Sequence, residues 1–61
     1  MDESSDQRSD KAQEQLIRAE GLEKLGSNEA ARIEYEAIVS KYPETLQAGK
    51  AKEYLKELEK K

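Results

Sequence analysis

Hydrophobic residues recur at helical spacing in three stretches between Ala12 and Leu58, and turn-forming residues separate the stretches. In the first stretch the steps of three and four place the apolar side chains on one broad stripe of a helix. We therefore expect a helix over residues 11–25. Its apolar positions are Ala12, Leu16, Ile17, Ala19, Leu22 and Leu25. Gly21 interrupts the stripe at a cost of about 1 kcal/mol relative to alanine, so it is either a tolerated defect or a point where a second helix backbone approaches closely.

Turn signals define both ends of a second helix. Gly26 follows the last apolar residue of the first stretch and suits the left-handed conformation that ends a helix. Ser27 can cap the helix that follows, because its hydroxyl can accept a hydrogen bond from the first turn. Pro43 ends this helix, since proline disfavours helical backbone in the residue before it. The second helix is expected over residues 28–42, and the short turn makes it antiparallel to the first.

The second helix carries apolar residues on two sides, so it needs two neighbours. One row steps by four, three and four: Ala31, Tyr35, Ile38 and Tyr42. The other row is offset around the helix: Ala30, Ile33 and Ala37. A two-helix hairpin covers only one of these sides, and a third helix is therefore required. Thr45 can cap it, and we expect it over residues 46–59. The pattern predicts an all-α fold of three stacked antiparallel helices.

Charge and composition exclude several classes of partner. Residues 1–10 contain no apolar residue after Met1, and we expect them to be a disordered acidic segment before a domain at 11–61. From Lys11 onward ten acidic residues balance ten basic ones, so we expect no nucleic-acid partner. No apolar run approaches the roughly 20 residues of a membrane span, and the acidic start contains no apolar segment of a secretory signal. We expect no direct membrane insertion.

The reactive side chains do not form a catalytic pattern. The chain has no cysteine and no histidine, which removes thiolate chemistry, the commonest metal ligand and the commonest general base. Pairs of carboxylates two residues apart, such as Glu34 and Glu36, point to different sides of a helix. We therefore expect no enzyme activity, no catalytic residue, no cofactor and no metal site.

The segment KLGSNEAARIEYEAIVSKYPET, followed by A-x-x-A-x-x-Y-L, resembles the tetratricopeptide repeat, a helix–turn–helix unit of about 34 residues. The Tyr-Pro pair with Thr45 is most similar to the bacterial envelope branch, of the Tol–Pal coordinator and outer-membrane assembly lipoprotein type. The first helix departs from the family, with Gln15 at its tryptophan position and Arg18 at its leucine position. The positions that the resemblance makes structural are Ala19, Leu22, Gly26, Ala31, Tyr35, Ile38 and Pro43.

The resemblance implies one repeat plus a capping helix in a right-handed array, and a scaffold or adaptor function with a protein or peptide partner. In the family the ligand lies in a concave groove lined by the first helix of each repeat. Carried onto this chain, that groove face is Gln13, Leu16, Glu20, Glu23 and Lys24. Its mixed, slightly acidic character suits a basic or amphipathic segment. Leu16 and Glu20 stand where chaperone-binding relatives place lysine and asparagine, so a chaperone-tail clamp is not supported.

Other readings follow from the small size of the chain. About three repeats are normally needed for a stable stack, which favours self-association. The alternative function is therefore a structural self-assembly element, as a homo-oligomer or as a docking domain of a longer, membrane-anchored bacterial protein. A generic three-helix bundle with accidental spacing is the competing fold, and an amphipathic membrane-surface element is disfavoured by a mean hydropathy of -1.11. As part of a longer chain, a cytoplasmic or an envelope-associated location fits the sequence.

Overall fold

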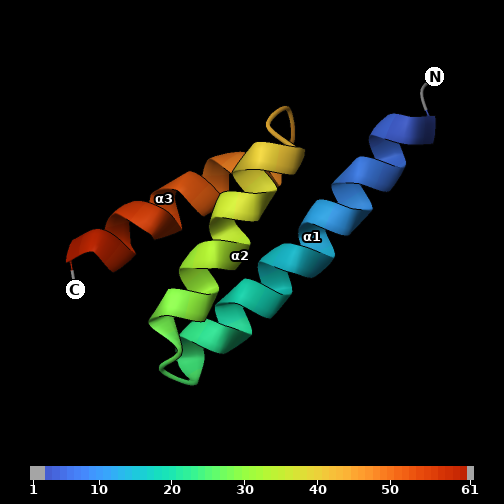
Figure 1. Ribbon diagram of the computed structural model, residues 1–61. Coiled ribbons are helices and arrows are strands. Elements are labelled where there is room, and N and C mark those ends of the chain that lie inside the picture. The colour runs from blue at the N-terminus through green and yellow to red at the C-terminus, as the bar shows by residue number, and fades with distance from the viewer. Residues whose placement is uncertain (1–2, 61) are drawn as a thin grey trace.

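Three helices make up almost all of the chain in the computed structural model, which describes the backbone of residues 3–60 and the side chains of residues 7–60. They are α1 (Glu3–Lys24), α2 (Asn28–Lys41) and α3 (Leu46–Lys60), and the described part of the chain contains no strand. Figure 1 shows α1 and α2 as an antiparallel hairpin, with α3 on the opposite side of α2. The chain is thus a three-helix, all-α bundle, as the apolar pattern predicts.

The turn between α1 and α2 closes with the hydrogen bonds of a Schellman motif. Gly26 has φ +87°, the left-handed conformation that glycine adopts without steric cost. Its amide donates to the Glu23 carbonyl at 3.0 Å, and the Ser27 amide donates to the Leu22 carbonyl at 2.9 Å. The predicted role of Gly26 is confirmed. Ser27 does occupy the N-cap position of α2, but its side chain makes no capping hydrogen bond.

The corner between α2 and α3 uses a threonine cap. The Thr45 Oγ1 accepts a hydrogen bond from the Ala48 amide at 3.2 Å and donates to the Tyr42 carbonyl at 2.7 Å. One hydroxyl therefore starts α3 and also satisfies a carbonyl just beyond the end of α2, where Pro43 prevents further helix. This confirms the predicted cap at Thr45.

The core is narrow because small side chains form most of it. Its members among the described residues are Ala12, Leu16, Ala19, Ala31, Tyr35, Ile38, Ala48, Ala51 and Leu58. Five of these nine are alanines, which bring the helix backbones close together, and Tyr35 and Ile38 are the largest side chains that are fully buried. In the second apolar row of α2, Ala30 and Ala37 are half-buried, whereas Ile33 remains 64% exposed. That side of α2 is thus only partly covered.

The start of α1 differs from the sequence-based expectation. Residues 3–10 form the first turns of α1, although their composition predicts disorder; Met1 and Asp2 lie outside the described residues. The physical reason is a contact far away in the sequence. The side chain of Arg8 reaches the α2–α3 corner, where it hydrogen-bonds the Lys41 carbonyl at 2.9 Å and forms an ion pair with Glu44.

Gly21 does not mark a close helix crossing. It is exposed, and a Cβ placed on it would have no atom within 4 Å beyond its immediate surroundings. Of the two interpretations offered by the sequence, the close approach is therefore wrong and the tolerated defect stands. Gly49 in α3 is equally open, and the buried alanines Ala48 and Ala51 form the contact surface of that helix instead.

Candidate functional site

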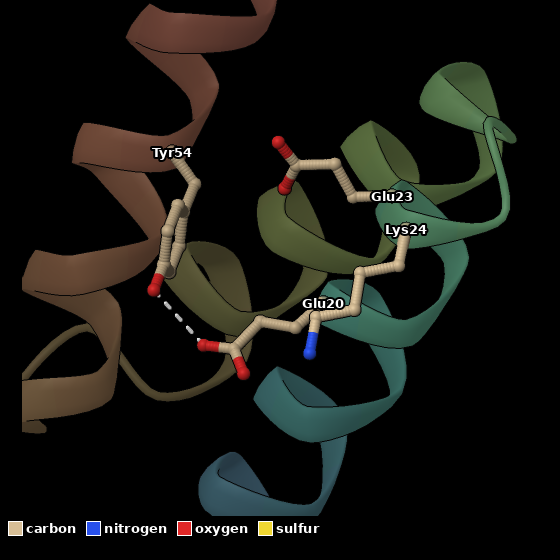
Figure 2. Close-up of a pocket in the computed structure, with 4 residues that line it drawn as sticks. All are labelled: Glu20, Glu23, Lys24 and Tyr54. Carbon is tan, nitrogen blue, oxygen red and sulfur yellow. Dashed lines mark hydrogen bonds between the residues drawn. The ribbon is translucent and has the colours of Figure 1, made fainter.

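A pocket of about 420 Å³ opens between the last turns of α1 and the middle of α3. Glu20, Glu23 and Lys24 line it from α1, and Tyr54 lines it from α3 (Figure 2). α2 brings these residues together, because α1 and α3 both pack against it. The sides of α1 and α3 that face each other then meet next to the core. The pocket therefore depends on all three helices, although only two contribute to its lining.

Tyrosine hydroxyls fix the orientation of both carboxylates. Tyr54 Oη donates to Glu20 Oε2 at 3.0 Å, the bond drawn as a dashed line in Figure 2. Behind the pocket, Tyr35 Oη of α2 donates to Glu23 Oε1 at 2.9 Å. The two tyrosine rings stack with their centroids 5.0 Å apart and an interplanar angle of 24°. Two parallel Tyr–Glu pairs thus link all three helices around one aromatic stack.

The surroundings keep both tyrosines in the protonated, donating form. Burial raises the pKa of Tyr35 well above its ordinary value near 10, and the hydrogen bond to Glu23 raises it further. For Tyr54 the hydrogen bond to Glu20 is the largest cause of a raised pKa, followed by the charge of the same carboxylate. Two carboxylates and one ammonium line the pocket, so its formal charges leave one negative charge in excess.

The five groove residues predicted from the family resemblance fall into three groups. Glu20, Glu23 and Lys24 line the pocket. Gln13 lies further along the α1–α3 junction, where its Oε1 accepts a hydrogen bond from Gln47 Nε2 at 2.8 Å. Leu16 is only 3% exposed and belongs to the core, so its proposed place on a binding surface needs correction. The position of Leu16 in the sequence is compatible with the groove and with the core. In the structure it lies in the core, because burial of a leucine side chain is favourable.

Tyr54 is the pocket residue that the groove assignment missed. The resemblance points to the first helix of each repeat, and the groove residues that it predicts here all belong to α1. The signal that could have found Tyr54 was its flanking position on α3 together with the enrichment of tyrosine at binding hot spots.

The positions that the repeat resemblance makes structural lie mainly in the core. Ala19, Ala31, Tyr35 and Ile38 have no exposed surface. Leu22 packs partly buried against the core, Gly26 forms the turn, and Pro43 lies exposed after α2. Comparison of the chain with protein-family models, curated proteins and solved structures finds no match.

The described residues contain neither a metal-binding cluster nor a membrane-spanning helix. Within residues 7–60, no three side chains of the histidine, cysteine, aspartate or glutamate type are grouped as a metal ion would require. None of the helices in the described part of the chain is both long enough and apolar enough to cross a membrane.

Proposed function

We propose that the chain is a protein-interaction module of the tetratricopeptide type, a scaffold or adaptor without catalysis, and that its α1–α3 face takes a basic segment of a partner protein. The observation that carries this proposal is the pocket in which tyrosine hydroxyls orient the carboxylates of Glu20 and Glu23. Acceptors that are already oriented lose less conformational entropy when a ligand arrives, which favours binding.

The chemistry of the pocket favours a cationic side chain. A lysine or arginine entering beside Tyr54 meets the carboxylates of Glu20 and Glu23, which attract a cation. The excess negative charge of the lining also favours a cation, and because Lys24 already offsets one of the two carboxylates, one further cation balances the pocket. An acidic segment would meet two like charges, so the same surface disfavours it.

The architecture supports the family part of the proposal. The glycine turn at Gly26 between α1 and α2, and the presence of a third helix directly after α2, are both features that a repeat followed by a capping helix would have. Three of the residues that line the pocket belong to the groove face that the resemblance predicts. The exposed side chains of the final turns of α3 are charged, which suits a helix that ends a stack: Lys56, Glu57, Glu59 and Lys60.

A peptide titration tests the proposal. The chain is titrated with a short peptide rich in lysine and arginine and with an acidic peptide of the same length, while amide chemical shifts are followed. The basic peptide should shift the amides around Glu20 and Tyr54, and Glu20→Gln should weaken its binding about tenfold. Glu59→Gln, an equal change of charge on the exposed side of α3, is the matched control and should leave binding unchanged. Equal shifts with both peptides, or shifts elsewhere only, would reject a basic partner.

A second candidate function, a self-assembly element, is favoured by exposed apolar side chains. Four large ones are prominent among the described residues: Ile17 at 57%, Leu25 at 81%, Ile33 at 64% and Leu46 at 86% exposure. Burying such side chains against a second copy is favourable by about 25 cal/mol per Å² of apolar area. Sedimentation equilibrium separates the candidates, because a strict monomer at high concentration removes the assembly function. If a dimer forms, Ile33→Ser should weaken it.

A further inference from the structure

Arg8 fastens the N-terminal part of α1 to the corner between α2 and α3. Its Nη2 donates to the Lys41 carbonyl at 2.9 Å and to Glu44 Oε1 at 3.2 Å, and its Nε pairs with Glu44 Oε2. The guanidinium carbon lies 5.8 Å from the centre of the Tyr42 ring. In Figure 1 the first turns of α1 and the α2–α3 turn lie at the same end of the bundle.

The partners of Arg8 form a set that suits a guanidinium. Both oxygens of Glu44 face the planar fork of nitrogen atoms, a geometry that an ammonium cannot match. The Lys41 carbonyl belongs to the last residue of α2, where the helix dipole is negative and attracts a cation. The Tyr42 ring adds a π-face on which arginine stacks. Among these partners, Lys41 is the cationic one, and it contributes its backbone carbonyl rather than its side chain.

Among the side chains described from Gln7 onward, few besides Arg8 attach the first turns of α1 to the rest of the bundle. Gln7, Asp10 and Lys11 are exposed, Ser9 is half-buried, and the first core side chain is Ala12. Helices in proteins are stabilised chiefly by packing of an apolar face, and a helical segment of this length is marginal in water without such packing. The docking of these first turns therefore depends on Arg8.

We propose that the α2–α3 corner is a guanidinium-binding site filled by the chain's own Arg8, and that the first turns of α1 form a releasable strap. With Arg8 seated, the strap is helical and docked. With Arg8 displaced, residues 3–10 fray, and the face of Tyr42 and the carboxylate of Glu44 become available to a guanidinium group from elsewhere. Because the Arg8–Glu44 pair is exposed, salt screens it, and the docked population falls as ionic strength rises.

Nuclear magnetic resonance on the full chain tests this strap. Wild type should show helical Cα shifts over residues 3–10 and a nuclear Overhauser effect between the Arg8 side chain and the Tyr42 ring. Arg8→Ala should lower the ratio of docked to undocked strap about tenfold, since it removes an ion pair and a cation–π contact together. Arg8→Lys should recover only part of the docking, because it restores the charge without the fork. Added salt should reduce helicity in wild type and have little effect on Arg8→Ala.

Two variants complete the experiment. Arg32→Ala removes an exposed arginine that pairs with Glu36 within α2 and lies away from the α2–α3 corner, so it should leave the shifts of residues 3–10 unchanged. Glu44→Gln removes the negative charge that pairs with Arg8, so its effect on the strap should resemble that of Arg8→Ala. With two variants, the test still holds if one of them lowers the stability of the whole fold. Retained helical shifts over residues 3–10 in both variants would overturn the strap. Full docking in Arg8→Lys would overturn the guanidinium specificity of the corner.

Discussion

Tyr35 shows, at the scale of a single residue, how one side chain can serve the core and the pocket together. It has no exposed surface, its ring stacks on Tyr54, and its hydroxyl donates to Glu23. The spacing of apolar residues on α2 predicts its burial correctly. The hydroxyl's partner lies 12 residues away on α1, and no periodicity in the sequence identifies such a pair. The polar half of its role is therefore visible only in the structure.

Tyr35→Phe tests the value of that hydrogen bond. The substitution keeps the ring and its stacking but removes the donor to a carboxylate, so the free energy of unfolding should fall by about 1–2 kcal/mol. Urea unfolding followed by circular dichroism measures the change. Tyr54→Phe is the control, since Tyr54 is only half-buried whereas Tyr35 is fully buried, and removal of its hydroxyl should cost less. An equal loss in both variants would contradict the importance of burial at Tyr35.

The same residue gives the protein a sensitivity to alkaline pH. The pKa of Tyr35 is raised in the folded chain above its ordinary value near 10, so its contribution to stability is fully present below pH 10. Above that pH the unfolded chain loses the proton while the folded chain keeps it, and stability falls as pH rises toward the folded pKa. We expect the free energy of unfolding to decline above about pH 10, and Tyr35→Phe to have a shallower decline. A spectroscopic titration of the tyrosines with parallel urea unfolding measures both. Identical slopes would exclude Tyr35 as the source.

At the scale of the helical elements, the sequence predicts those helix ends that are set by neighbouring residues. The expected helices at 28–42 and 46–59 agree with α2 and α3 to one residue at each end, because Gly26, Pro43 and Thr45 act on their immediate neighbours. The start of α1 is missed by eight residues, since the hydrogen bonds of Arg8 reach partners 33 and 36 residues away. The same holds for the pocket. The sequence predicts that Glu20 lies on the binding face of the first helix, but it does not predict the hydrogen bond between Glu20 and Tyr54.

Two glycines of this hairpin should respond to alanine in opposite directions. Gly26 needs its φ of +87°, so Gly26→Ala should destabilise the fold by about 1–2 kcal/mol through strain in the left-handed conformation. Gly21 has regular helical surroundings and open space at its Cβ position, so Gly21→Ala should stabilise by about 0.5–1 kcal/mol. Thermal unfolding of the two variants measures both effects, and each is the control for the other. A loss of stability in Gly21→Ala would show that a contact at that position has been overlooked.

At the scale of the whole molecule, the alanine-rich core leaves no pair of helices self-sufficient. A chain of 61 residues buries only about 60% of the surface that its unfolded form exposes. Three of the nine core side chains come from each helix, so removal of any helix takes away a third of the core. α2 lies between α1 and α3 and packs against each of them more extensively than they pack against one another, and its Tyr35 ring stacks on a ring of α3. We therefore expect all three helices to unfold together in one cooperative transition.

A chain that stops at Thr45 tests this dependence. It lacks α3, which removes Ala48, Ala51 and Leu58 from the core and uncovers the Tyr35 ring. The remaining α1–α2 hairpin should lose its cooperative thermal transition, and its helical circular dichroism should fall by much more than the share of the 15 residues of α3. A chain that ends at Glu59 keeps all nine core residues and serves as the matched control, with an expected transition close to that of wild type. If the hairpin alone unfolded cooperatively, α2 would not need a neighbour on each side. α3 would then be dispensable for folding, although it supplies one wall of the pocket.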